Sequence, residues 1–358
     1  MHGLDIARFL ADAWQQTPLL IPHATTSLPA LSPDELAGLA LEEGVSARLV
    51  VGTDPDWQVD KGPFHDNSFF IEGPWTLLVE AVDHHIPEVA TLRQLVSFLP
   101  SWRFDDVMVS YATDGGGVGP HFDRYDVFLL QGEGQRRWRL GQSCDQSEPL
   151  RHINGLTLLE KFEQTAEYVL GPGDILYIPP GVAHWGIAEG HCMTYSLGFR
   201  APRIADLLSR QLDERLESVD LDLLLADPGR PATRPGELHA IDISNALQQM
   251  TQTLEYSDSP NHWLGELVTE SALEPIYPSA KDLLPATVRI DPASRWAWQQ
   301  APDTVTLFTN GTTRSVASEL LPLLIRLCSG NSVDCETCSD LERTFLEQQW
   351  QAGTLIDE

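Results

Sequence analysis

The sequence predicts a mixed β and α protein whose first part is an antiparallel β-sandwich or barrel and whose later part is largely helical. Three observations lead to this prediction. Between Asp106 and Arg200, short β-rich runs alternate with glycine and proline turns. No long helical pattern interrupts these runs, which argues against a parallel doubly wound sheet. After Ala201-Pro202 the apolar residues recur at helical spacing instead.

Two helices are predicted before the barrel. The first lies within residues 1–20, where the apolar residues near helical spacing are Ile6, Phe9, Leu10 and Trp14. Pro18 and Pro22 end this pattern. The second helix is predicted over residues 90–99, where the apolar stripe consists of Leu92, Leu95, Val96 and Leu99.

The barrel segment is a series of strand-like runs. They read VMVSYA, YDVFLLQ, RRWRLG, EYVLG, DILYIPP and CMTYSLGF. The string QGEGQ between the second and third runs is typical of a hairpin turn. In the third run, Arg136 and Trp138 share one strand face, while Arg137 and Arg139 share the other. Periodicity alone does not decide which of these faces points inward.

The segment after the barrel is predicted to form amphipathic helices. Apolar stripes run through Ile204, Leu207, Leu208, Leu212 and Leu216, and through Ile243, Leu247, Met250 and Leu254. The Pro/Gly-rich string DPGRPATRPGE separates them. Helices without a large core of their own either cover the barrel or pair with a second subunit.

Residues 280–358 have the order strand–helix–helix–strand, which is typical of a winged helix. The predicted strand is VTLFTNG, and the predicted helices are VASELLPLLIRLCSG and LERTFLEQQWQAG. Residues 281–358 hold 6 Lys/Arg against 11 Asp/Glu, whereas DNA binding needs a basic surface. We therefore expect this module to be structural or to contact protein.

The charge of the chain excludes one class of partner. With 52 acidic and 23 basic residues the net charge is −29, which repels nucleic acid and attracts basic proteins. A surface adapted for solubility explains the same charge. No apolar run is long enough to span a membrane, and the N-terminus lacks the basic start and apolar stretch of a signal peptide. The expected location is the cytoplasm.

The five cysteines do not predict a disulfide framework. Cys335 and Cys338 form a CxxC pair, and Cys328 lies upstream. A structural zinc site usually needs a second such pair, which the sequence lacks. A chance pairing is the favoured interpretation of this CxxC.

Three residues predict a metal site. His121 and Asp123 are two positions apart, so on a strand both point to the same face. Far along the chain, LGPGDILYIPPGVAHWG carries a tight turn, a strand, and a Pro-Pro-Gly turn that presents His184. Two imidazoles and one carboxylate form the facial triad that binds Fe(II) and leaves positions open for substrate and dioxygen.

Other residues near these strings are candidates for ligand binding. Arg136 offers a planar cation for the far carboxylate of a dicarboxylic 2-oxo acid. The glycine run 115–117 lacks the ending of a phosphate loop and lets the backbone pass close to a ligand. Asp114, just before it, reads from spacing alone as a surface turn residue.

At these strings the chain resembles the JmjC-type ribosomal oxygenases of the cupin superfamily, and most of all their bacterial arginine hydroxylases. The matching stretches are VMVSYATDGGGVGPHFDRYDVFLLQGEGQRRWRLG, PGDILYIPPGVAHWG and TYSLGFRAP. The order of barrel, helices and winged helix matches as well. The resemblance implies a double-stranded β-helix (jelly-roll) catalytic domain over 1–202. It implies a helical dimerisation domain over 203–275 and a winged-helix-like domain over 276–358.

The resemblance also implies the chemistry. His121, Asp123 and His184 would bind Fe(II), and Arg136 would hold the 5-carboxylate of the co-substrate 2-oxoglutarate. The family hydroxylates a basic residue of a large-subunit ribosomal protein, here an arginine at its β-carbon. Asp114 and Tyr125 would then contact the guanidinium. A homodimer is implied too.

One position departs from the family pattern. Relatives often carry an amide on the strand after the second histidine, where this chain has Thr194. The hydroxyls of Ser110 and Ser196 are candidates to replace its contact with the co-substrate. Two other functions remain open on the sequence alone. One is the same chemistry on another basic target, as a histidyl hydroxylase or lysyl demethylase. The other is a metal-binding cupin scaffold without catalysis.

Overall fold

The computed structural model of the chain describes residues 1–54, 56–220, 222–228, 238–255, 262–271, 283–302 and 304–357. It divides into two compact units. The first comprises Met1–Ala201, Pro275–Ala293 and Pro322–Glu358, and the second Pro202–Glu274 and Ser294–Leu321. The division into 1–202, 203–275 and 276–358 stays a prediction. None of the described helices has the length and apolarity needed to cross a membrane.

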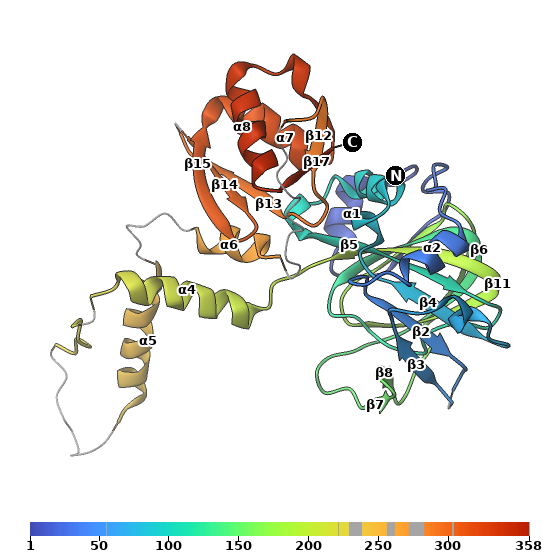
Figure 1. Cartoon of the computed structure of the whole chain (residues 1–358). Helices are drawn as coiled ribbons and strands as arrows, with labels where there is room; N and C mark the ends of the chain where they lie inside the picture. Colours follow the sequence, from blue (N-terminus) through green and yellow to red (C-terminus); the bar gives the residue numbers. More distant parts are fainter. Residues whose placement is uncertain are drawn as a thin grey trace. The chain divides into compact units, whose positions relative to one another are not determined.

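A 9-stranded antiparallel sheet forms the body of the first unit, in the order β1-β10-β6-β11-β5-β4-β2-β3 with β9 beside β6 (Figure 1). Its strands are β1 (Leu19–Ile21), β2 (Ala47–Val51), β3 (Gln58–Lys61), β4 (Trp75–Val79), β5 (Phe104–Ala112), β6 (Asp126–Ser143), β9 (Ala166–Leu170), β10 (Ile175–Ile178) and β11 (Val182–Phe199). The predicted antiparallel β domain is confirmed.

The long strands β6 and β11 hold this sheet together. Each has 18 residues, and they pair from Val182 opposite Ser143 to Phe199 opposite Asp126. Strand β6 pairs with β10 through its first part and with β9 through its later part. A strand that changes neighbours at an irregularity turns the corner of a barrel.

The predicted hairpin turn at QGEGQ is wrong. These residues lie inside β6, where the register with β11 shifts between Glu189 and Thr194. Gly134 there has a φ of 63°. A bulge with a left-handed glycine continues the strand while bending it, and in sequence it has the same composition as a turn.

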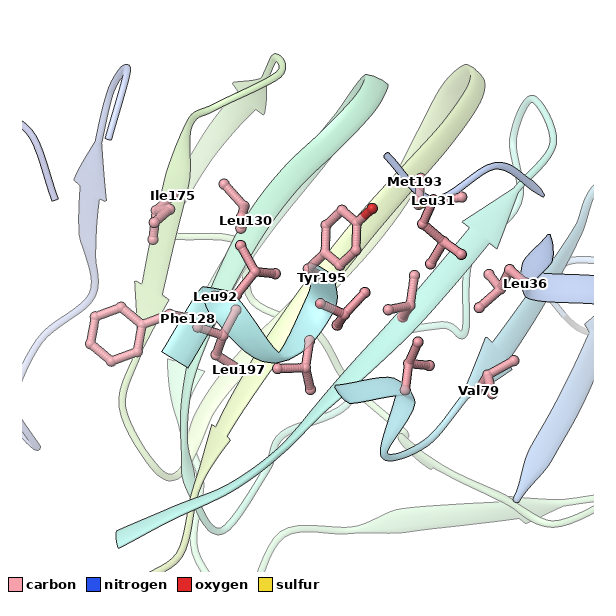
Figure 2. Close-up of a cluster of buried hydrophobic side chains, with 14 of the residues drawn as sticks. Leu31, Leu36, Val79, Leu92, Phe128, Leu130, Ile175, Met193, Tyr195 and Leu197 are labelled. Carbon is pink, nitrogen blue, oxygen red and sulfur yellow. The ribbon is translucent and has the colours of Figure 1, made fainter. Parts of the chain in front are cut away.

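The core of the barrel lies between one face of this sheet and the N-terminal helices. Figure 2 shows side chains from the strands, among them Phe128, Leu130 and Ile175, together with Leu36 and Leu92. Helix α1 (Ile6–Asp12) adds Phe9, which is 2% exposed and packs edge-on against Tyr177. Helix α2 (Pro33–Leu39) begins with a capping box at Ser32.

The second predicted N-terminal helix is short. It consists of α3 (Pro87–Ala90) followed by the 3₁₀ helix η3 (Thr91–Val96). Leu92 and Val96 are buried within η3, and Leu99 is buried just after it. Three further 3₁₀ helices are η1 (Asp66–Phe69), η2 (Val82–His84) and η4 (Ser101–Arg103).

A small hairpin stands apart from the large sheet. Strands β7 (Leu150–Ile153) and β8 (Leu156–Leu159) are joined by Asn154 and Gly155, both with positive φ. An Asn-Gly pair is the preferred tight hairpin turn because both residues tolerate this conformation.

The C-terminal part of the first unit carries a three-stranded sheet in the order β16-β12-β17. Its elements are β12 (Thr287–Ile290), β16 (Val333–Asp334), η6 (Cys335–Thr337), α8 (Asp340–Gln351) and β17 (Leu355–Asp357). Helix α8 starts at a capping box on Ser339 and buries Phe345, Leu346 and Trp350. Helix α7 (Leu321–Cys328) precedes β16. Both predicted helices are confirmed, while most of the short strands were not predicted.

The second unit contains α4 (Ile204–Ser218), α5 (Ala240–Glu255), α6 (Trp263–Thr269), η5 (Ser318–Leu320) and the sheet β13 (Trp296–Gln300), β14 (Thr304–Thr309) and β15 (Thr312–Ala317). Helix α6 packs on this sheet, where Gly265 leaves room for the ring of Phe308. Neither α4 nor α5 buries any residue. Their apolar stripes stay exposed, with Leu208 at 57% and Met250 at 61%.

Candidate metal and co-substrate site

Three potential metal ligands meet inside the barrel of the first unit. His121 lies opposite His184 of β11 in an isolated β-bridge, closed by N–H···O=C bonds of 3.0 and 2.8 Å. Asp123 Oδ2 lies 3.5 Å from His184 Nε2. One ligand atom from each of the three residues lies within 4.8 Å of the other two. The backbone thus brings together side chains that are far apart in sequence.

Backbone carbonyls fix the tautomers of both histidines. His121 Nδ1 lies 2.9 Å from the carbonyl oxygen of Gly119, and His184 Nδ1 lies 2.9 Å from that of Val182. A carbonyl only accepts hydrogen bonds, so each Nδ1 must carry the proton. Each Nε2 then has a free lone pair, which is the arrangement that metal-binding histidines require.

The surroundings hold His121 and Asp123 in their metal-binding charge states. Burial lowers the pKa of His121 to about 4, and the neighbouring His184 acts in the same direction. This imidazole is therefore neutral near neutral pH. Burial acts to raise the pKa of Asp123, but the neighbouring imidazoles of His184 and His121 outweigh it and leave the pKa below its usual range. The carboxylate is therefore ionised.

A cavity of about 400 Å³ opens beside these ligands. The three ligands line it together with Arg136, Ser110, Ser196 and Tyr125. The cavity is large enough for a small acid and part of a side chain, so the ligands face open space and not a packed core.

Arg136 lies in this cavity as a buried cation. It is 5% exposed, and its Nη1 donates a 3.0 Å hydrogen bond to Ser110 Oγ. Its Nε and Nη2 have no hydrogen-bond partner among the described residues. A buried guanidinium without a carboxylate is costly, and an anion with two oxygens would satisfy it.

The structure also decides which arginines face inward. On the opposite face of β6, Arg137 forms ion pairs with Glu167 and Glu189, and Arg139 pairs with Glu167 at 3.2 Å. These side chains are about one-third exposed. The outer face is thus a solvated ion-pair network, while Arg136 faces the cavity.

The remaining predicted site residues separate into two groups. Ser110, Ser196 and Tyr125 line the cavity, and Tyr125 is hydrogen-bonded to Asp123. Thr194 is fully buried but is not among the cavity-lining residues, since its hydroxyl donates to Gln131 Oε1 at 3.0 Å.

Asp114 does not line the cavity either. Its side chain is exposed, and its Oδ1 accepts a 2.8 Å hydrogen bond from the backbone N–H of Gly190. This geometry agrees with the interpretation, made from spacing alone, of Asp114 as a surface turn residue. A carboxylate held in this way still has one oxygen available for a cation.

Several cavity-lining residues were not among the predicted site residues. They are Arg48 from β2, Thr76 from β4, Met108 from β5, Trp138 from β6, and Leu156 and Leu158 from β8. Arg48 could have been identified from the sequence, because it is the one cationic residue in the apolar run ARLVV. Thr76 and the β8 leucines could not, since nothing in their strands separates them from ordinary core residues.

The chain matches three family models. One described as a JmjC domain matches residues 91–207, and one described as a ROXA-like winged helix matches residues 248–351. A third, described as an AraC-like ligand binding domain, matches residues 162–274. The first spans the three metal ligands and Arg136.

Individual proteins are similar over most of the chain. Ribosomal protein uL16 3-hydroxylase of Escherichia coli (strain K12) is 39% identical over 74% of this chain and 72% of its own length. A probable ribosomal oxygenase of Haemophilus influenzae is 36% identical over 70% of this chain and 64% of that protein. A solved structure of YcfD, a ribosomal oxygenase from Escherichia coli, in complex with cobalt and 2-oxoglutarate, is similar with a TM-score of 0.80 at 32% identity. That similarity covers 99% of this chain and 98% of the other.

Proposed function

Because the chain belongs to the JmjC-type ribosomal oxygenases, we propose that it is an Fe(II)- and 2-oxoglutarate-dependent protein hydroxylase in which His121, Asp123 and His184 hold the metal. One observation carries the proposal. A two-histidine, one-carboxylate cluster and a buried cation with unsatisfied donors line the same cavity. These are the groups that a chelating dicarboxylic acid needs at its two ends.

The donor set fits Fe(II). Two imidazoles and one carboxylate leave three coordination positions open. Iron bound there would supply the reduction of dioxygen, coupled to oxidation of 2-oxoglutarate to succinate and CO₂ and to insertion of one oxygen atom into a C–H bond of the substrate. The chain's own groups position the reactants. Arg136, held by Ser110, binds the far carboxylate in the same cavity as the metal ligands.

The proposed target is an arginine of a large-subunit ribosomal protein, hydroxylated at its β-carbon. The Escherichia coli relative is named as a uL16 3-hydroxylase, and the net charge of −29 attracts a basic protein. Tyr125, which is 41% exposed, presents its ring at the cavity. We propose that it contacts the substrate guanidinium and that Asp114 provides a carboxylate for it.

A homodimer and a cytoplasmic location belong to the same proposal. Helices α4 and α5 leave a groove of about 960 Å³ lined by Leu212, Leu216, Leu223 and Met250, among other residues. Exposed apolar surface of this extent is typical of a protein interface. The proposed occupant is the same surface of a second copy. A ribosomal substrate supports a cytoplasmic location.

The test is turnover by the purified protein. With Fe(II), 2-oxoglutarate, dioxygen and a peptide of uL16 that contains the target arginine, we expect succinate and a peptide heavier by one oxygen atom. His121→Ala should abolish both products, because two ligands no longer complete the triad. Asp145→Asn, a change of an exposed carboxylate outside the cavity, is the control and should keep both. Binding of metal and 2-oxoglutarate without either product would identify a scaffold and contradict the proposal.

A further inference from the structure

The side chain of Trp138 lies between His184, one of the proposed metal ligands, and Arg136. On the inward face of β6, Arg136, Trp138 and Leu140 follow one another, and their partners on β11 are Ala188, Gly186 and His184. Trp138 therefore lies midway along the line from the cation to the metal-binding histidine. Its ring centroid is 5.9 Å from that of His184, and the Arg136 guanidinium carbon is 5.9 Å from the same indole.

The opposite strand makes room for this indole. A Cβ on Gly186 would lie 2.8 Å from ring atoms of Trp138, closer than real Cβ atoms approach. Any side chain at this position would push the ring out of place. The glycine therefore keeps Trp138 against the cavity wall, where it is 6% exposed.

The indole N–H of Trp138 is buried without a hydrogen-bond partner among the residues described. Buried indole N–H groups usually find an acceptor, because an unsatisfied donor costs about 1–3 kcal/mol. Arg48, Thr76 and Arg136 line the same cavity and also bury polar atoms that lack partners in the described part of the chain. Donors that gather around one cavity point to an oxygen-rich ligand in it.

We propose that Trp138 is a further binding residue for 2-oxoglutarate: its indole N–H donates a hydrogen bond to a carboxylate oxygen, and its ring packs against the methylene groups. This inference rests on the proposed function. An acid that joins the metal to Arg136 must pass the side chain that lies between them. Trp138 would thus fix the path of the co-substrate, while Arg136 and the metal fix its ends.

The chain contains a matched control in Trp57. This residue is 3% exposed, and its indole N–H also lacks a partner within the described ranges. It packs with Val50, Leu78 and Leu158 and is not one of the cavity-lining residues. Trp138→Phe and Trp57→Phe therefore remove the same group from similarly buried positions, and only the first change faces the ligand.

The experiment is calorimetric titration of 2-oxoglutarate into the full chain loaded with Co(II), without turnover. A hydrogen bond to a carboxylate is worth enough that Trp138→Phe should raise the Kd about tenfold or more, while Trp57→Phe leaves it within about twofold of wild type. Thermal unfolding of both variants reports whether they fold. If Trp138→Phe does not fold, 3-benzothienylalanine at position 138 replaces only the N–H by sulfur, and the same increase is expected.

Two results would overturn the inference. One is a Kd for Trp138→Phe equal to that of wild type. The other is an equal rise in Kd in both variants, which would report a loss of core packing and not of a ligand contact. Failure of the proposed function looks different, because wild type would then bind no 2-oxoglutarate or would bind it without forming hydroxylated peptide.

Discussion

At the scale of single residues, the charge state of a few buried groups decides what the barrel can hold. Arg136 is the clearest case, since a guanidinium that is 5% exposed keeps two donor atoms without partners among the described residues. Lysine would preserve the positive charge, but its single ammonium group cannot replace the planar guanidinium, which binds a carboxylate through two N–H groups. We therefore expect Arg136→Lys to raise the KM for 2-oxoglutarate about tenfold or more and to change the KM for the peptide little. Arg137→Lys, on the solvated face, is the control, and equal effects of both changes would refute this role.

Asp83 makes the stability of the barrel depend on pH. Its side chain is 4% exposed, and burial raises its pKa to about 7, although the backbone N–H of Val107 donates to it at 2.8 Å. In the unfolded chain an aspartate titrates near pH ~3.9. Between pH ~3.9 and about 7, the Asp83 carboxyl is protonated in the folded state and ionised in the unfolded state. The free energy of unfolding therefore falls as pH rises through this window and is constant above it.

Asp83→Asn should remove this slope, because the amide oxygen can still accept from Val107 and carries no charge. Relative to wild type the variant should gain up to about 4 kcal/mol at pH 8, and this gain should disappear below pH ~4. Urea unfolding at a series of pH values, followed by tryptophan fluorescence, measures it. A wild-type stability that is flat between pH ~4 and ~7 would contradict the buried-proton account.

At the scale of elements, a bulge in β6 determines which arginine reaches the cavity. Before the bulge Val127 and Leu129 line the cavity, and after it Arg136 and Trp138 do so. Side chains on a regular strand alternate, so the change from odd to even positions requires one extra residue between them. Without it Arg137 would face inward and Arg136 would lie among the surface ion pairs.

Gly134 is the residue that permits this bulge. Its φ is 63°, and a Cβ there would lie 2.1 Å from the carbonyl oxygen of His191. Gly190 has a φ of 73°, but a Cβ there meets nothing within 4 Å. Both alanine substitutions add backbone strain of about 1 kcal/mol, and only Gly134→Ala adds a clash. We expect Gly134→Ala to weaken 2-oxoglutarate binding several-fold and to lower stability more than Gly190→Ala. Equal behaviour of the two variants would show that the bulge does not position Arg136.

This bulge limits how far the site can be predicted from the sequence. The spacing of His121 and Asp123 and the Pro-Pro-Gly turn before His184 are local patterns, so the three metal ligands could be predicted. The inward face of β6 could not be predicted, because QGEGQ has the composition of a turn and the strand periodicity breaks within it. Thr194 shows a second limit. The position of Thr194 on the strand is compatible with a ligand contact. Only the three-dimensional structure shows that its hydroxyl donates to Gln131 Oε1 instead.

At the scale of the whole molecule, the helices α4 and α5 expose more apolar surface than a monomer needs. Leu212 is 47% exposed and Leu247 is 57% exposed. If a second copy covers this surface, Leu212→Glu with Leu247→Glu places charges in the interface and should shift the protein from dimer to monomer in sedimentation velocity. Asp213→Asn, an exposed polar change on α4, should leave the dimer intact. A wild-type monomer at micromolar concentration would contradict the proposed dimer.

The claim that the barrel hydroxylates a ribosomal protein is tested most directly by intact-mass spectrometry of ribosomal proteins from cells with and without this gene. In the deletion strain we expect one large-subunit protein to be lighter by the mass of one oxygen atom. The wild-type gene should restore that mass, and a gene carrying His121→Ala should not. Identical masses for every ribosomal protein in the two strains would contradict the account.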